Sequence, residues 1–417
     1  MESLKEQLIK SLLTTNNFNA SLDEVKLVAQ KAGIQPDYPI ILIGGTNGKG
    51  STCAYLTTIL TNAGYKTGTF TSPHVFDYNE RIAINNKPVN DQDLTEALEL
   101  VIEHSHVNLG LFKTFTLASH LIFRKYKIDI AIIEVGIGGL NDATNIFDPD
   151  ISAITSIGLD HCKILGNTTE EIGLNKAGIF RSNRPAFIAG EITPESVTTY
   201  ANDIKADLNI FGRHFNFIRH SVSWDFISSE ISYYSLPMPS LRGHEQLNNA
   251  ALSLAILAKL RSRFPVSLSQ IKFGLLQTTL IGRFQVLPGT PQIVLDTAHN
   301  PQAIEMLLQN MIKLHFAKRT LSVFGIASDK DWQRAVVLTK NHFDKWYLTR
   351  LPNDRSCDPT QIKEFIQKQG LKPSQIECYD SIEAAILQAQ TELTADDRLV
   401  CFGSFLIVEA AYKLLKS

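Results

Sequence analysis

The segment 40–52 constrains the fold more than any other part of the chain. Its four leading apolar residues predict a buried parallel strand, the glycines after them predict a tight loop, and residues 54–63 predict the start of an amphipathic helix. In this order, backbone N–H groups and the helix N-terminus can hold phosphate, and Lys49 adds a full positive charge. The hydroxyls of Ser51 and Thr52 can meet the magnesium that accompanies ATP.

This segment departs from the strict Walker A pattern at two positions. Ile43 stands where the first glycine is expected, and Gly50 stands where a hydroxyl residue should follow the lysine. A glycine turn that binds no ligand is therefore an alternative. A lysine inside the glycines, followed by two hydroxyl residues, favours the phosphate site.

Length and the alternation of elements predict two α/β domains. A chain of 417 residues with 44% hydrophobic content exceeds the usual size of one domain. Short strands with one helix and aromatic hairpins are expected over 185–240, and strands alternate with helices over 292–415. The composition shifts to a turn near 280–285. We therefore expect a P-loop ATPase domain with a mostly parallel sheet over 1–282, and a smaller Rossmann-like α/β domain over 283–417.

Charge and cysteine usage argue against several classes of protein. The net charge is -2, from 40 basic and 42 acidic residues, so no overall field attracts nucleic acid or anionic lipid. The five cysteines are scattered without a C-x-x-C pair, which indicates reduced thiols rather than disulfides or a zinc site. The N-terminus is charged throughout, and no apolar run is long enough to span a membrane. We expect a cytoplasmic monomer with small-molecule substrates.

Polar residues at predicted strand ends are candidates for a metal site. Ser72 follows the predicted strand 66–70, and Glu134 interrupts the apolar run 130–135. A buried carboxylate is costly unless it is paired or binds a metal, so Glu134 is the best magnesium candidate. A strand-end carboxylate that reaches solvent is the alternative. The polar loop 141–145 suits hydrogen bonds to a ligand, and a bulged surface turn, which is common for such composition, is the alternative.

Three other positions stay open on residue chemistry alone. Magnesium prefers oxygen ligands, so His161 fits a structural or substrate-contacting role better than a metal site. Lys176 precedes a glycine at the end of the predicted helix 168–177, which is ordinary C-capping; a catalytic role is the alternative. The polar stretch 14–21 is either a helix connection or part of a substrate site.

An ordered set of motifs resembles folylpolyglutamate synthase, in the bacterial form that also acts as a dihydrofolate synthase. No single motif carries the resemblance, which spans nearly the whole chain. The motifs are Gly45-Thr46-Asn47-Gly48-Lys49-Gly50-Ser51, Thr71-Ser72-Pro73-His74 with Glu80-Arg81, Glu134-Val135-Gly136, Asp142-Ala143-Thr144-Asn145, Lys176-Ala177-Gly178-Ile179, Gly282-Arg283-Phe284 and Asp296-Thr297-Ala298-His299-Asn300-Pro301.

The resemblance implies an ATP-dependent amide ligase of folate biosynthesis. Such an enzyme joins L-glutamate to dihydropteroate and adds further glutamates to reduced folates. The substrate carboxylate would take the γ-phosphoryl group to form an acyl phosphate, and the glutamate amine would then displace phosphate. Charge neutralisation and alignment in a cleft between the domains would matter more than a strong base. ATP and two magnesium ions are implied.

The resemblance also implies roles for individual residues. ATP would contact Thr46, Asn47, Gly48, Lys49, Gly50, Ser51, Thr52, Asn249, Arg283 and Asp296. Ser72, Glu134 and His161 would bind one magnesium, which overrides the chemical preference at His161, and a carbamylated Lys176 would support the second. Lys49, Lys176 and His299 would be catalytic. Arg81, His299 and Ser404 would meet the glutamate carboxylates, and the pteroate pocket would contain Asn17, Phe18, Asn19, Ala20, Phe112, Lys113, Asn141, Asp142 and Ala143.

The sequence departs from the family pattern at a few positions. Lys113 stands where relatives often have glutamate, and Leu140-Asn141 replaces a frequent Arg-Leu pair. Both departures fall in the implied pterin pocket, so the reaction type is better specified than the preferred substrate. Glu245 replaces a frequent histidine, and Asn175 replaces the usual glutamate before Lys176.

Two other functions remain open. A Mur-type peptidoglycan amino-acid ligase shares the chemistry but carries a UDP-binding domain ahead of the central one, and only 44 residues precede Gly45. A P-loop module that binds nucleotide without ligation would give no reason for a second α/β domain bearing the motif at 296–301.

Overall fold

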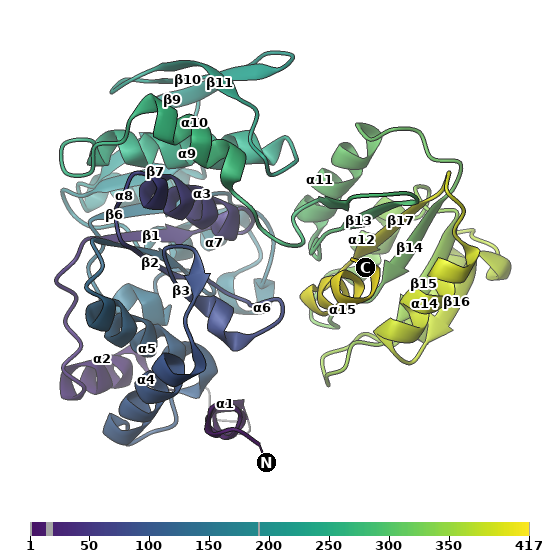
Figure 1. Cartoon of the computed structure of the whole chain (residues 1–417), viewed down its shortest axis with the longest axis horizontal. Coiled ribbons are helices and arrows are strands. Elements are labelled where there is room, and N and C mark those ends of the chain that lie inside the picture. Colours follow the sequence, from purple (N-terminus) through teal and green to yellow (C-terminus); the bar gives the residue numbers. More distant parts are fainter. Residues whose placement is uncertain (1, 14–19, 191, 417) are drawn as a thin grey trace. The chain divides into compact units, whose positions relative to one another are not determined.

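Two mainly parallel sheets organise the chain in the computed structural model, which describes residues 2–13, 20–190 and 192–416. Contacts divide the chain into two units, and helices pack against the sheet in each (Figure 1). The α/β class and the mostly parallel first sheet are confirmed. The first unit comprises Met1–Gly158, Cys162–Ser240 and Gln246–Thr278, and the second comprises Leu159–His161, Leu241–Glu245 and Thr279–Ser417.

The first unit is built on an eight-stranded sheet in the order β4-β3-β2-β5-β1-β6-β7-β8. Neighbouring strands from β2 to β8 pair in parallel, whereas β3 pairs antiparallel with both β2 and β4. Strands β2 and β5 lie on one side of β1, and β6, β7 and β8 lie on the other. The glycine loop therefore leaves the sheet where the strand order switches sides, the usual ligand position in such sheets. The strands are β1 (Ile40–Gly44), β2 (Thr67–Phe70), β3 (Ile82–Ile84), β4 (Lys87–Pro88), β5 (Ile130–Glu134), β6 (Ile151–Ile154), β7 (Pro185–Ile188) and β8 (Asp207–Ile210).

Helices bury the central strands of this sheet, so β1 and β5 are buried at every residue. Within the described residues, no helix is long and apolar enough to cross a membrane. The helices are α1 (Leu4–Leu13), α2 (Leu22–Lys31), α3 (Lys49–Asn62), α4 (Asp91–His104), α5 (Gly110–Tyr126), α6 (Cys162–Leu165), α7 (Thr169–Ala177), α8 (Glu195–Asp203), α9 (Glu245–Leu260) and α10 (Leu268–Gln277), with 3-10 turns η1 (Tyr78–Arg81) and η2 (Ala143–Ile146).

The structure corrects the expectation of an amphipathic helix over 54–63. Helix α3 begins at Lys49, and its residues are buried almost all round. It packs against β1, β2 and β5 as well as against α10. A Cβ atom at Gly274 of α10 would lie 2.4 Å from Cγ1 of Ile59, which shows how closely the two helices meet. A helix enclosed on two sides has no polar face.

The second unit contains a six-stranded sheet in the order β12-β13-β17-β14-β15-β16, antiparallel only between β12 and β13. Its core contains the rings of Phe324, Phe343, Trp346 and Phe402, which meet edge-to-face or tilted. The elements are β12 (Gln285–Leu287), β13 (Gln292–Leu295), β14 (Thr320–Phe324), β15 (Lys345–Thr349), β16 (Ile376–Tyr379), β17 (Arg398–Phe402), α11 (Pro301–Ile312), α12 (Trp332–Thr339), α13 (Pro359–Lys368), α14 (Ile382–Glu392) and α15 (Phe405–Leu415).

A small antiparallel sheet of β9 (Phe215–Arg219), β10 (Ser223–Ser228) and β11 (Tyr233–Pro237) contains the expected aromatic hairpins. Trp224 and Phe226 are fully buried. The elements β12, β16 and α10 have no counterpart in the sequence-based expectations. The two strands have only three and four residues, too few for a periodic pattern to be visible.

His120 of α5 is a buried titratable group in the first unit, and it gives a test of the packing there. Its Nδ1 lies 2.8 Å from the hydroxyl of Tyr38, and its ring packs against Phe123 and Phe147. Burial lowers the pKa of His120 to about 3. Because this value lies below that of the unfolded chain, the contribution of His120 to stability is present above about pH 6.5 and is lost as the pH falls.

We predict that the stability advantage of the wild type over His120→Gln decreases on acidification. At about 1.4 kcal/mol per pH unit, the difference in unfolding free energy should fall by about 2 kcal/mol between pH 7.5 and pH 5. Urea unfolding of both proteins at the two pH values measures this difference. The other titrating groups are the same in both proteins, so their contributions cancel in the comparison. The same difference at both pH values would contradict the neutral, buried state of His120.

Candidate active site

The glycine loop after β1 is shaped by close packing against the segment that follows β6. Gly45 and Gly48 have positive φ angles of 139° and 93°. A Cβ atom at Gly45 would lie 2.0 Å from Oγ1 of Thr155, so only glycine fits there. The Thr155 hydroxyl donates to the carbonyl of Asn47 at 2.6 Å, and the Asn47 N–H donates to Oγ of Ser156 at 3.0 Å.

Lys49 and the hydroxyls after it complete a cradle that fits a phosphate group. The Lys49 ammonium donates to the carbonyls of Gly45 and Thr46 at 3.0 and 3.3 Å, so it lies over the loop. Ser51 and Thr52 are buried at the start of α3. Among the described residues no group pairs with Oγ1 of Thr52, and a buried hydroxyl of this kind suits a ligand oxygen.

Asn249 lies against this loop. It is buried in α9, and a Cβ atom at Gly48 would lie 2.4 Å from its Oδ1. The structure therefore brings one expected ATP residue from α9 to the glycine loop, 200 residues away in the sequence, within the first unit.

Glu134 ends β5 beside the glycine loop, because it pairs in register with Ile43 of β1. Its side chain is 4% exposed, which contradicts the alternative of a carboxylate that reaches solvent. The backbone N–H of Ser72 donates to Oε2 of Glu134 at 3.0 Å. Two expected metal residues thus meet. His161 falls in the second unit.

The described residues contain no group of three or more His, Cys, Asp or Glu side chains that could form a metal cage. A single buried carboxylate nevertheless suits magnesium, which keeps several waters and binds one or two carboxylates together with substrate phosphates. Glu134 with Ser72 therefore fits a magnesium ion that arrives with a nucleotide.

Lys176 is buried, with 4% of its surface exposed, in the last turn of α7. A lysine that only capped the helix would extend into solvent. The end of α7 packs against the loop after β5, where a Cβ atom at Gly139 would lie 2.7 Å from the Lys176 carbonyl. The burial favours the functional interpretation over simple C-capping.

The expected substrate residues on α5 and the η2 loop lie together with Ala20. The ammonium of Lys113 donates to the Ala20 carbonyl at 2.6 Å. Burial lowers the pKa of Lys113, opposed by the charges of Glu24 and Asp142. Asp142 is buried, and desolvation raises its pKa although the Thr144 hydroxyl and backbone N–H groups bind it. Three further residues of the expected pocket, Asn17, Phe18 and Asn19, lie outside the described residues.

Three more members of the expected pocket differ in exposure. Phe112 packs over Gly136, whose Cβ atom would lie 2.6 Å from Cζ of that ring. Asn141 is exposed and Ala143 is buried. The polar loop therefore has both a buried and an accessible part, rather than being only a surface turn.

In the second unit, the end of β13 presents Asp296 and the residues around it. The carboxylate of Asp296 accepts the N–H groups of Phe284 and Ala298 at 2.8 and 2.7 Å. Burial raises the pKa of Asp296 to about 6, opposed by the charge of Arg283. Arg283 donates to the Thr297 hydroxyl at 2.5 Å and lies 5.3 Å over the ring of Phe405. Ser404 caps α15 through Leu406 N–H.

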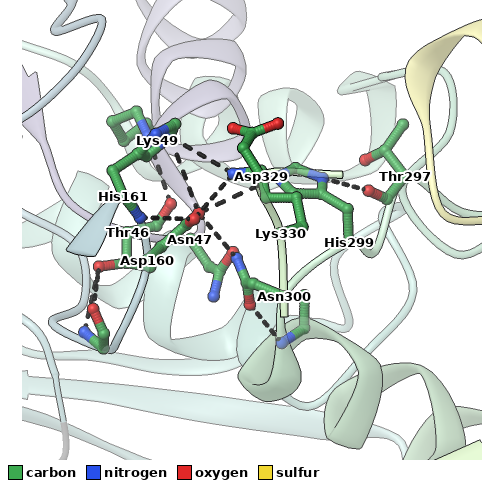
Figure 2. A network of polar contacts seen from close by, with 12 residues as sticks. Thr46, Asn47, Lys49, Asp160, His161, Thr297, His299, Asn300, Asp329 and Lys330 are labelled. Atoms are coloured by element: carbon green, nitrogen blue, oxygen red, sulfur yellow. Dashed lines mark hydrogen bonds and ion pairs between the residues drawn. The ribbon is translucent and has the colours of Figure 1, made fainter. Parts of the chain in front are cut away.

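His299 and Asp160 form a second polar group in this unit (Figure 2). Nδ1 of His299 lies 2.7 Å from the carbonyl of Thr297, so Nδ1 carries the proton and Nε2 is the acceptor. Burial and the charge of Lys330 lower the pKa of His299 to about 4. Asp160 accepts from Lys330 at 2.7 Å and from Asn300 at 3.3 Å.

The ion pair of Asp160 and Lys330 was not among the expected site residues. Burial acts to raise the pKa of Asp160, but the charges of Lys330 and His161 outweigh it and lower this pKa. Both residues follow strands, β6 and β14, and that position is the only sequence signal for them. Their pairing joins positions 170 residues apart, which no local pattern reveals.

Two family models match this chain. The Mur ligase middle domain matches residues 43–257, and the Mur ligase glutamate ligase domain matches residues 282–405. Together with the glycine loop, Lys49 and the buried Glu134, these matches show that the chain belongs to the Mur ligase family.

More similar proteins narrow the class. The Dihydrofolate synthase/folylpolyglutamate synthase of Escherichia coli (strain K12) is 34% identical over 395 residues, which cover 94% of this chain and 90% of that protein. The chain belongs to the dihydrofolate synthase/folylpolyglutamate synthase family.

Two solved structures share the whole fold. E. coli FolC in complex with DHPP and ADP matches with a TM-score of 0.92 and 32% identity, covering 99% of this chain and 98% of that one. A bifunctional folylpolyglutamate synthase/dihydrofolate synthase with Mn, AMPPNP and L-glutamate bound matches with a TM-score of 0.88 and 32% identity, covering 98% and 96%.

The contact between Gly48 and Asn249 predicts how much stability is lost when a methyl group is added at Gly48. Gly48 and Gly64 have φ angles of 93° and 94°, but nothing lies within 4 Å of a Cβ atom at Gly64. Gly64→Ala should cost about 1 kcal/mol from backbone strain, and Gly48→Ala should cost about 1–3 kcal/mol more because Asn249 must move.

Urea unfolding of both alanine variants measures this difference, with Gly64→Ala as the control for the positive φ angle. An equal loss of stability in the two variants would show that the loop accepts a side chain at Gly48.

Proposed function

We propose that this protein is an ATP-dependent acid–amino-acid ligase that joins L-glutamate to dihydropteroate, making dihydrofolate, and adds further glutamates to reduced folates through an acyl phosphate. The likeness to the E. coli enzyme over nearly the full length of both chains carries the proposal. Residues 1–282 would form the ATP-binding domain and 283–417 the glutamate-ligase domain. No specific observation favours peptidoglycan ligation or nucleotide binding without ligation.

The glycine loop and α3 offer charged and polar groups to a nucleotide. When bound, ATP supplies the phosphoryl group, and magnesium neutralises its charge. Thr46–Thr52 would hold the phosphates, because Lys49 lies over the loop carbonyls and the Thr52 hydroxyl is buried at the helix start. Asn249, Arg283 and Asp296 would contact other parts of ATP. The position of Asn249 against Gly48 supports the first of these roles.

Glu134 and Ser72 would hold the first magnesium, with His161 as a further ligand. The Ser72 N–H bond to Glu134 fixes the carboxylate in one orientation, which supports this role. A carbamylated Lys176 would support a second magnesium, because carbamylation turns the amine into an anion. Its burial supports this role, since a buried ammonium is costly.

The remaining residues would bind the two organic substrates. Arg81, His299 and Ser404 would meet the glutamate carboxylates. Ala20, Phe112, Lys113, Asn141, Asp142 and Ala143 would line the pteroate pocket together with Asn17, Phe18 and Asn19. Lys113 and Asp142 support this role, because a donor and an acceptor whose charges act on each other suit the polar edge of a pterin. We further propose that the enzyme is a cytoplasmic monomer.

The direct test is phosphate release by the purified protein. ATP, magnesium, L-glutamate and dihydropteroate should all be required, and UDP-muramyl substrates should give no release. Lys49→Ala should lower turnover at least about 100-fold because it removes charge stabilisation of the phosphoryl group. Lys26→Ala, on the exposed face of α2, is the matched control. Phosphate release that does not depend on glutamate would contradict the ligase.

Lys176 gives an independent test of the second metal site. Lys176→Ala should lower turnover at least about 100-fold, and a short-chain carboxylate such as acetate should restore part of it by replacing the carbamate anion. The same salt should not restore Lys49→Ala. Full activity of Lys176→Ala would support the C-capping role, and a loss that carboxylates do not restore would contradict carbamylation.

A further inference from the structure

Arg81 is a buried arginine for which the described residues supply no carboxylate. Its side chain lies in η1 and is 8% exposed. Nε donates to Nδ1 of His74 at 2.9 Å, and the rings of Tyr78 and Phe115 flank the guanidinium at 5.7 and 5.8 Å. Burying a guanidinium without an anion is costly. The surroundings of Arg81 therefore suit a negative group that comes from outside the protein.

The acids nearest in sequence are engaged elsewhere. Glu80 accepts the backbone N–H groups of Val75, Phe76 and Asp77 at 2.8 to 2.9 Å, so it closes the turn. Asp77 caps η1 and pairs with Lys5 of α1 at 3.3 Å. These contacts fix the backbone that carries Arg81 but leave its charge unpaired.

His74 occupies one edge of the guanidinium. Arginine nitrogens only donate hydrogen bonds, so Nδ1 of His74 is the acceptor in this contact. The His74 ring is itself held 4.1 Å from that of Tyr78. With Nε used in this way, no protein acceptor among the described residues takes a hydrogen bond from Nη1 or Nη2 of Arg81. That pair of nitrogens is the fork that binds a carboxylate with two parallel hydrogen bonds.

We infer that His74 is a positioning residue, which holds the Arg81 guanidinium through Nε so that its Nη edge receives a substrate carboxylate. The inference rests on the proposed function, which gives Arg81 a carboxylate, and adds the residue that orients it. Phe115 follows Phe112 and Lys113 on α5, and the charge of Glu134 acts on Arg81. The carboxylate belongs to either the pteroate or the glutamate.

Two nearly isosteric variants test the inference. His74→Asn keeps an acceptor oxygen close to the position of Nδ1, whereas His74→Leu removes it. His74→Leu should raise the KM of one carboxylate substrate about tenfold, the value of one hydrogen bond to a charged group, and His74→Asn should stay within about twofold of the wild type. The KM of ATP should not change in either. Which KM rises, that of L-glutamate or that of dihydropteroate, identifies the source of the carboxylate.

A double-mutant comparison separates orientation from general damage. In an Arg81→Met background, His74→Leu should change neither substrate KM further, because its effect acts through the guanidinium. His74→Phe, which keeps a ring against Tyr78, replaces His74→Leu if that variant does not fold. Equal KM values for the Asn and Leu variants, or the same increase without Arg81, would overturn the inference. A wild-type protein without glutamate-dependent turnover would contradict the proposed function itself.

Discussion

The contact between Gly45 and Thr155 fixes the shape of the phosphate loop, and the site in the first unit depends on it. The Thr155 hydroxyl binds the carbonyls of Gly44 and Asn47 at 3.2 and 2.6 Å, so the loop after β1 is held by the segment after its neighbour β6. This anchoring needs no ligand. Lys49 already lies over the loop carbonyls, which means that an arriving phosphate replaces weak acceptors and meets donors that are already in place.

The parallel sheet explains why the polar residues gather where they do. Strands β2, β5, β1 and β6 run in the same direction, so their carboxyl ends share one edge. Ser72, Glu134, Lys49 and Thr155 follow or end those strands, although they are spread over more than 100 residues of sequence. In the second unit, β13, β14 and β17 bring Asp296 and the other strand-end residues to one edge by the same geometry.

Local sequence signals, such as helix caps and a charge within an apolar run, predicted individual elements and residues well. They did not predict the contacts between segments far apart in the sequence. Helices α13 and α15, in the region where strands and helices were expected to alternate, each begin at a side-chain cap that the sequence displays, Asp358 and Ser404. Glu134 was identifiable because a charge in an apolar run is conspicuous. The burial of Lys176 was not identifiable, since its sequence is that of an ordinary helix end. The pairing of Asp160 with Lys330 and the enclosure of α3 by α10 depend on tertiary contacts, on which periodicity carries no information.

The second unit contains a histidine, His299, that is a weak base. A histidine with a pKa of about 4 is neutral at physiological pH, and its Nδ1–H is bound to the Thr297 carbonyl. Its Nε2 lone pair can accept a hydrogen bond from an amine, but as a proton acceptor it is weak. Burial and then the charge of Lys330 keep it weak, because protonating His299 would place a second cation near the first. Asp160 pairs with Lys330, and its charge acts to raise the pKa of His299 without outweighing burial and Lys330. In the proposed reaction, such an arrangement would orient an amine rather than activate it, which suits a leaving group that is already activated as a phosphate.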